Sequence, residues 1–308
     1  MSWEKFKDVK VKHKQKTLKQ RFSATADVLS YRRCPRQYGF ESEKGFVPSL
    51  PSQIFVGTII HEVLDRAHGY FKGKRDPNTK NKIPSDDDIE AFFNEVENAL
   101  RAQGMRVPGK VKDFSLRILK NFNRIEGANL YPKVVDTEHR LQADREDYIL
   151  YGVVDVLVSG VNEAGEPRVE IWDYKGSHRP GKDDAGLARM KDYKFQMQVY
   201  ANLYKLRNLV YPSKAVIYFV GELADSVDKR PDNAMMEIEL DEDMISTALN
   251  EFDSTVKQIV SSTENNYWPP ADKGHETAGK ETCSICDERW SCPIESKNYP
   301  KRYLGQGE

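Results

Sequence analysis

Apolar residues return every three or four positions in several long segments of the chain. The spacing predicts amphipathic helices over residues 54–71 and 188–208, and another over Asp241–Val260 that Asp241 caps. Near the start of the chain, Ser23 is a candidate cap for a helix that runs toward Cys34 and that Pro35 ends or bends.

Two further helices are expected within one long helical segment. Ile89–Leu100 and Phe114–Ile125 show helical periodicity and are separated by a Gly/Pro break. We interpret roughly residues 73–130 as a helical insertion.

The pattern changes at residue 134 to short runs of β-branched and aromatic residues. Turn-like breaks separate these runs, which therefore predict a meander of three or four strands. The predicted strands are Val134–Val135, Tyr148–Tyr151, Val153–Val158 and Val169–Trp172, followed beyond the next helix by Ala215–Gly221 and Met235–Leu240. Strands mixed with helices indicate an α/β protein with a central mixed sheet flanked by helices.

Composition and charge add bounds to this interpretation. The chain has 308 residues, 39% of them hydrophobic, which suffices for a buried core. No run approaches the length of a membrane-spanning helix, and the Lys-rich start lacks the apolar stretch of a secretory signal, so we expect a cytoplasmic protein without membrane contact.

The net charge of −1 is unevenly distributed along the chain. Residues 1–21 hold eight Lys and Arg against two acidic residues, which gives this segment a charge of +6 and the remainder −7. We treat residues 1–22 as a basic N-terminal arm. It is either a solvated terminus or an arm that contacts nucleic acid.

Three charged residues lie within the predicted strands. Asp155 interrupts an apolar run, while Asp173 and Lys175 are two positions apart and so share one face of a strand. Buried carboxylates need a counter-ion or a metal, and oxygen ligands favour Mg²⁺ or Mn²⁺. Together with a histidine they predict metal-assisted hydrolysis of a phosphodiester, with Lys175 beside the cation. The alternative is a structural Asp–Lys ion pair.

The four cysteines form a second constellation. Cys283, Cys286 and Cys292 follow a C-x₂-C-x₅-C pattern, and Cys34 lies far upstream. Four thiolates suit zinc or an iron–sulfur cluster, and such a site would tie the start of the chain to its end. The alternative is four reduced thiols without a metal.

Taken together, the motifs resemble those of the RecB-like branch of the PD-(D/E)XK nuclease superfamily. More narrowly they are similar to its iron–sulfur members, the AddB-type nuclease domains and the CRISPR-adaptation exonucleases. The resemblance covers roughly residues 22–295. It rests on the segment around Cys34, on G-x₃-H at Gly57–His61, on Glu138, on G-x-x-D at Gly152–Asp155, on Asp173-Tyr174-Lys175, on Q-x₃-Y at Gln196–Tyr200 and on the cysteine triplet.

The resemblance assigns roles to these residues. It implies that His61, Asp155, Asp173 and the Tyr174 carbonyl bind Mg²⁺ or Mn²⁺. Lys175 would be the catalytic lysine. Gln196 and Tyr200 would support the site or contact DNA. The alternative for these two residues is ordinary packing of a helix. The four cysteines, Cys34, Cys283, Cys286 and Cys292, would hold a [4Fe–4S] cluster.

The resemblance also implies a restriction-endonuclease-like fold in one nuclease domain over residues 23–308. Its catalytic core would span about 134–221 and a cysteine-rich C-terminal staple 270–295. The expected activity is an exonuclease on single-stranded DNA or DNA ends, in repair, CRISPR adaptation or defence. The chain departs from the family at Gly176-Ser177, where Thr-Gly is more usual, and it contains no G-x₄-G-K-[S/T] motif, so any helicase would be a separate partner chain.

Two other functions fit the same residues. The chain is alternatively a DNA-binding subunit of a helicase–nuclease or defence complex with little activity of its own. A zinc-stapled structural protein is the third interpretation.

Overall fold

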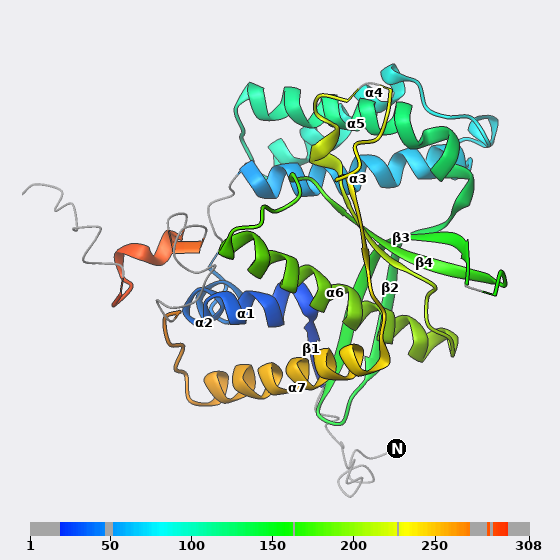
Figure 1. Cartoon of the computed structure of the whole chain (residues 1–308). Coiled ribbons are helices and arrows are strands. Elements are labelled where there is room, and N and C mark those ends of the chain that lie inside the picture. Colours follow the sequence, from blue (N-terminus) through cyan, green and yellow to red (C-terminus); the bar gives the residue numbers. More distant parts are fainter. Residues whose placement is uncertain are drawn as a thin grey trace, which may run out of the picture.

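The computed structural model describes residues 19–46, 52–162, 164–226, 228–271, 282–283 and 286–294. Six strands and the helices around them follow one another along these residues (Figure 1). In chain order, the elements are β1 (Gln20–Ser23), η2 (Ala24–Leu29), α1 (Ser30–Arg33), α2 (Pro35–Tyr38), η3 (Gly39–Glu43), α3 (Ser52–Phe71), η4 (Pro77–Thr79), α4 (Asp86–Ala102), α5 (Gly109–Leu130), η5 (Tyr131–Lys133), β2 (Val134–Asp144), β3 (Tyr148–Val161), β4 (Pro167–Lys175), α6 (Asp184–Asn208), β5 (Ala215–Phe219), η6 (Val220–Leu223), β6 (Met235–Ile238), α7 (Glu242–Glu264) and η8 (Asp287–Trp290).

The strands form one mixed sheet, which confirms the predicted α/β class. Strands β2, β3 and β4 make an antiparallel meander, β5 pairs parallel to β4, and β6 pairs antiparallel to β5. The runs predicted at Tyr148–Tyr151 and Val153–Val158 belong to the single strand β3, so the meander has three strands. β1 adds a short parallel strand to β3.

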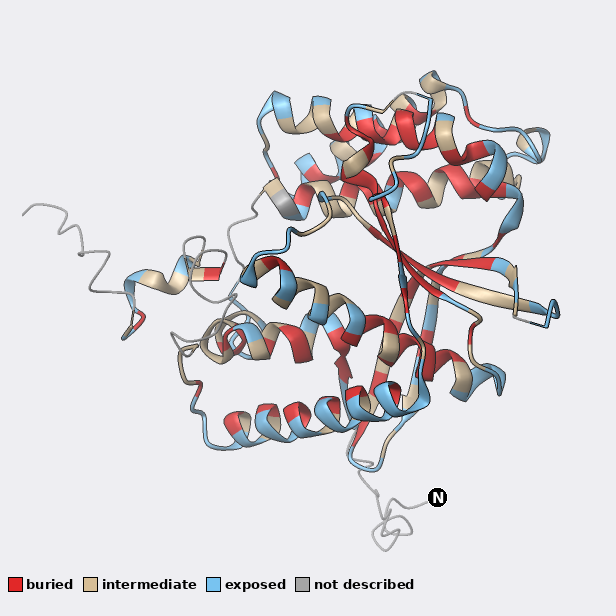
Figure 2. Cartoon of the chain, in the orientation of Figure 1, coloured by how far each residue is buried: buried red, intermediate tan, exposed pale blue. Residues whose placement is uncertain are grey.

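Two helical layers cover the sheet, one on each face (Figure 1). α3, α4 and α5 pack on one face, where Trp172 and Tyr174 of β4 point, while α6, α7 and the N-terminal helices pack on the other, where Ile171 points. Figure 2 shows that α7 buries one side and exposes the other, as its predicted amphipathic pattern requires. No helix within the described ranges is long and apolar enough to cross a membrane.

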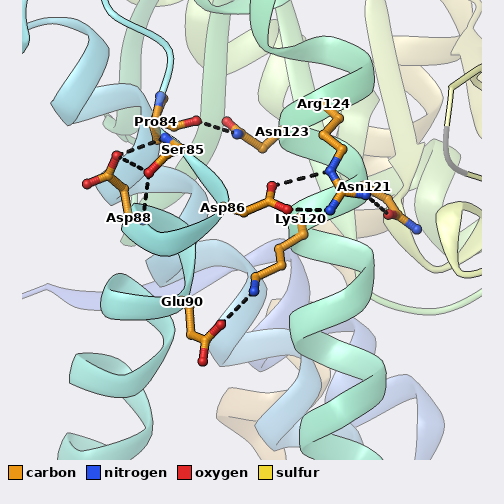
Figure 3. Close-up of polar contacts among 9 residues, drawn as sticks. All are labelled: Pro84, Ser85, Asp86, Asp88, Glu90, Lys120, Asn121, Asn123 and Arg124. Carbon is orange, nitrogen blue, oxygen red and sulfur yellow. Dashed lines mark hydrogen bonds and ion pairs between the residues drawn. The ribbon is translucent and has the colours of Figure 1, made fainter.

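The segment predicted as a helical insertion supplies much of the layer formed by α3, α4 and α5. Ser85 and Asp88 form a reciprocal cap at the start of α4. Ion pairs and a hydrogen bond from a side-chain amide then connect that end of α4 to α5 (Figure 3). These contacts are Lys120 with Glu90 at 2.6 Å, Arg124 with Asp86, and the Asn123 side chain with the Pro84 carbonyl at 2.7 Å. The α4–α5 pair covers the sheet because Phe122 packs against Tyr174 and Tyr218.

The N-terminal helices bend where the sequence predicts. Cys34 is extended between α1 and α2, and Pro35 begins α2. Trp268, beyond α7, packs on Tyr31 and Tyr38, and Gly39 leaves the space for its indole, because a Cβ there would lie 2.4 Å from the ring. The segment after α7 therefore packs on the N-terminal helices.

Most of the basic N-terminal arm lies outside the described residues. Of its cations, Lys19 pairs with Asp144 at 2.6 Å, and Arg21 lies over the Tyr151 ring. These two side chains contact the β2–β3 hairpin, so the end of the arm is part of the sheet.

Candidate active site

The candidate site lies at an interruption in the pairing of β3. β2 pairs along one side of β3, so β1 and β4 share the other side, β1 opposite residues 148–151 and β4 opposite 156–161. Residues 152–155 lie between these two ladders. Gly152 admits the Tyr200 ring of α6 at this point, since a Cβ would lie 2.7 Å from it. The glycine of the G-x-x-D motif and the tyrosine of Q-x₃-Y thus pack together.

Asp155 lies at the end of this interruption and bridges two elements. One carboxylate oxygen accepts the backbone N–H of Tyr174 at 2.7 Å, and the other lies 3.3 Å from Nδ1 of His61 on α3. Burial acts to raise the pKa of Asp155, but the charges of His61 and Lys175 hold it below its usual value. Burial acts to lower the pKa of His61, whereas Asp155 raises it to about 9.

Glu138 on β2 completes a cluster of three ligand-bearing residues. Each of His61, Glu138 and Asp155 offers one ligand atom, and these atoms lie within 4.8 Å of one another, the one such group among the residues described. Glu138 has a φ of 49°, a conformation that costs free energy for a residue other than glycine. Desolvation and the charge of Asp155 raise its pKa to about 7. One imidazole and two carboxylates suit Mg²⁺ or Mn²⁺.

Asp173 is directed toward α6 and has different partners. Its Oδ1 accepts a hydrogen bond from the Gln196 amide at 2.6 Å, and its Oδ2 lies 2.7 Å from Nζ of Lys175. This confirms that Asp173 and Lys175 share one face of β4. Burial raises the pKa of Asp173, Lys175 partly offsets that effect, and the charge of Asp155 adds to it.

Three groups surround the Lys175 ammonium. Besides Asp173, the Gln196 carbonyl accepts its hydrogen bond at 3.2 Å, and the Tyr193 ring lies beneath Nζ at 5.0 Å from the centroid. Burial acts to lower the pKa of Lys175, but the charges of Asp173 and Asp155 raise it. Tyr193 is not recognisable as a site residue from its own segment, where its one signal is its position three residues before Gln196 on a helix face.

Gly176 explains one departure from the family pattern. A Cβ there would lie 2.7 Å from Ile60 and 2.9 Å from Val56 of α3, so the chain after Lys175 passes close to that helix. By contrast, Gly57 of the G-x₃-H motif has open space where a Cβ would be.

Tyr174 anchors the strand beneath the site. Its buried hydroxyl lies 3.2 Å from Nε2 of His68, and its N–H binds Asp155. The proposed metal contact of its carbonyl stays a prediction, as does that of Asp173, whose carboxylate here contacts Lys175 and Gln196.

None of the four cysteines forms a disulfide, and Cys34 and Cys292 are buried. Burial raises the pKa of the Cys286 thiol, and the neighbouring Cys34 adds to that shift. Arg36, two residues after Cys34, donates to the Ser291 carbonyl at 3.3 Å, next to Cys292. The segments that carry Cys34, Cys286 and Cys292 thus approach one another, and four cysteines outside any disulfide are a donor set suited to a cluster.

A mixed sheet with an Asp, an Asp-x-Lys on the adjacent strand and a histidine on the covering helix defines the class of α/β nuclease-like proteins. A family model described as the PD-(D/E)XK nuclease superfamily matches residues 21–293, and the chain belongs to this superfamily. No curated protein matches its sequence. A crystal structure of a candidate exonuclease from Eubacterium rectale is similar in fold, with a TM-score of 0.50, 13% identity, and coverage of 83% of this chain and 85% of that one.

Proposed function

We propose that the protein is a metal-dependent DNA exonuclease that acts on single-stranded DNA or DNA ends. The observation that carries the proposal is the ligand cluster of His61, Glu138 and Asp155 beside the ion-paired Lys175. Membership of a nuclease superfamily supports the reaction class. The fold likeness to a protein described as a candidate exonuclease supports cleavage from ends.

The residues divide the chemistry between them. His61, Glu138 and Asp155 would hold Mg²⁺ or Mn²⁺, with Asp173 and the Tyr174 carbonyl as further ligands. When bound, the cation supplies Lewis acidity toward a phosphodiester. The raised pKa of Lys175 keeps its ammonium charged, so its role is to stabilise negative charge on the phosphate rather than to accept a proton. Gln196 orients Lys175 and Asp173 together, and Tyr200 packs against Gly152.

The decisive experiment is cleavage of end-labelled single- and double-stranded DNA by protein purified without oxygen, with Mn²⁺ or Mg²⁺. Asp173→Ala should abolish cleavage, while Asp184→Ala, an exposed acid at the start of α6, should retain it. The ladder from each labelled end gives the polarity. Cleavage retained in a clean preparation of Asp173→Ala would refute the site. A folded wild type that binds DNA but cleaves it with neither metal would instead indicate a subunit that needs a partner such as a helicase.

We also propose that Cys34, Cys283, Cys286 and Cys292 hold a [4Fe–4S] cluster. The support is the absence of any disulfide among them and the contact of Arg36 with Ser291, which brings the segments around Cys34 and Cys292 together. Protein purified without oxygen should be brown and lose its visible absorption on oxidation, and Cys286→Ser should weaken that absorption. A colourless preparation that contains zinc would refute the cluster.

A further inference from the structure

A rigidly anchored basic connection follows Lys175. The connection between β4 and α6, residues 176–183, begins at the end of the strand that carries Asp173 and Lys175. The backbone N–H of Arg179 binds Glu222 at 2.7 Å, and Asn233 donates to the other oxygen of Glu222 at 2.6 Å. Gly221 lets the backbone at Ser177 approach closely, because a Cβ there would lie 2.5 Å from the Ser177 carbonyl carbon. The main chain is therefore held by η6.

The cationic side chains of this connection differ in exposure, since Lys182 is exposed and Arg179 is half-buried. Within the described parts of the chain, the side chains of Arg179 and Lys182 make no hydrogen bond or ion pair. His178 is 61% exposed and lies 3.5 Å from Glu222. The nearby Asp183 caps α6 by accepting the N–H of Gly186. A fixed backbone that presents unpaired cations is preorganised to bind a polyanion.

The start of α5 extends this surface. The Phe114 ring lies 6.3 Å from the His178 ring, so this face of α5 adjoins the connection. Lys110 and Arg117 are four residues before and three residues after Phe114, and so share its helix face. Both are exposed, and neither has a salt-bridge partner in the ranges that the structure describes. The result is a cluster of cations around two partly exposed aromatic rings.

We propose that this surface, formed by Lys110, Phe114, Arg117, His178, Arg179 and Lys182, binds the single DNA strand that leads to the active site. The proposal rests on the nuclease function proposed above. Lys and Arg side chains contact phosphates, and exposed rings stack on bases that are free of a duplex. The strand would thus reach Lys175 along the connection that begins there.

The test measures binding of a fluorescent single-stranded oligonucleotide over a range of salt concentrations. All variants carry Asp173→Ala, which prevents cleavage. Arg117→Ala, Arg179→Ala and Lys182→Ala together remove three cations. The slope of log affinity against log salt concentration should decrease in magnitude by about 2, because each neutralised phosphate of a single strand contributes about 0.7 to this slope. Affinity at low salt should fall at least about tenfold.

Charge-matched and shape-matched variants make this result specific. Lys82→Ala, Lys133→Ala and Lys257→Ala together remove three exposed cations elsewhere and should leave the salt slope unchanged. His178→Ala should weaken binding about fivefold, and His178→Phe, which keeps a ring, should restore most of it. Equal losses in both triple variants, or an unchanged slope in the first, would overturn the proposal.

The two proposals fail in different ways. If the wild type cleaves DNA and Asp173→Ala does not, the nuclease stands whatever the triple variant does. If the triple variant loses binding and the wild type never cleaves, the binding surface stands without the nuclease. Thermal unfolding of each variant confirms that the fold is intact.

Discussion

Asp155 and Asp173 lie on neighbouring strands, yet their carboxylates have different surroundings. Asp155 faces His61 of α3 and Glu138 of β2, and these two residues bring two more ligand atoms within 4.8 Å. Asp173 faces α6, where the Lys175 ammonium lies 2.7 Å away and Gln196 donates a hydrogen bond. The Asp155 half of the site thus brings together groups that can bind a metal cation. In the Asp173 half, the carboxylate is already paired with the Lys175 ammonium.

The contrast separates the tasks within the site. Mutual repulsion of two buried carboxylates pushes their pKa values apart, and here the pKa of Asp155 is lowered while that of Asp173 is raised. We infer that the Asp155 half holds the metal first and that the Asp173 half places positive charge on the phosphate.

The largest effect is expected from Lys175→Ala. Cleavage should fall about 10²–10⁴-fold, the scale for a positioned charged group in catalysis. Mn²⁺ should nevertheless bind more tightly, because Asp173 is left buried without its counter-ion. Cleavage rates and Mn²⁺ titration followed by calorimetry measure both. Lys191→Ala, which replaces an exposed lysine on α6, is the control. Weaker Mn²⁺ binding in Lys175→Ala would contradict the division.

The next effect concerns pH and the Asp155 half. A metal needs the neutral imidazole of His61, whose pKa in the free protein is about 9. Below that pH the metal must displace one proton, so Mn²⁺ affinity should rise up to about tenfold per pH unit. Below about pH 7 the Glu138 carboxyl is protonated as well, so the metal must displace a second proton. Mn²⁺ titrations between pH 6.5 and pH 8 measure the slope.

Two histidine variants serve as controls for this slope. His61→Gln should flatten it and weaken binding. His139→Gln, which loses only a contact with Asp136, should keep it. A slope that is flat in the wild type would exclude His61 as a ligand.

Much of the fold and part of the site could be predicted from the sequence. The mixed sheet and the pairing of Asp173 with Lys175 follow from local periodicity, because the alternation of a strand alone fixes which side chains share a face. The insertion-like segment 73–130 could not be placed, since its packing on Tyr174 through Phe122 depends on contacts distant in sequence.

Glu138 and Tyr193 show the same limit at the site. Only the family resemblance indicates Glu138, because a positive φ within a strand cannot be predicted from the pattern of apolar residues. Tyr193 looks like any aromatic residue of an amphipathic helix until β4 places Lys175 over its ring. Both residues gain their roles from neighbours on other elements.

A third prediction compares two histidines on α3 with opposite shifts. Burial lowers the pKa of His68 to about 3, below the 6.5 of an unfolded chain. This neutral histidine contributes stability that is complete above pH 6.5 and is lost as the pH falls toward 3. At pH 5 the loss is about 2 kcal/mol. His61 has the opposite sign, with stability present below pH 6.5 and lost as the pH rises through about 9.

Urea unfolding at pH 7 and pH 5 measures the effect of His68. The free energy of unfolding should fall less between these pH values in His68→Phe than in the wild type, by about 2 kcal/mol. His178→Phe replaces an exposed histidine and should behave as the wild type does. Equal pH dependence in His68→Phe and the wild type would mean that His68 titrates normally in the fold.

The smallest effect concerns the ring beneath Lys175. Tyr193→Leu removes a cation–π contact of about 1 kcal/mol, so cleavage should fall about fivefold. Tyr193→Phe keeps the ring face and should cleave as the wild type does, since the hydroxyl is not what lies beneath Nζ. If Tyr193 only fills space, Leu and Phe will have equal rates. If the ring holds Lys175 in the Asp173 half, the Leu variant alone loses rate while its Mn²⁺ affinity is unchanged, because the ligands of the Asp155 half are untouched.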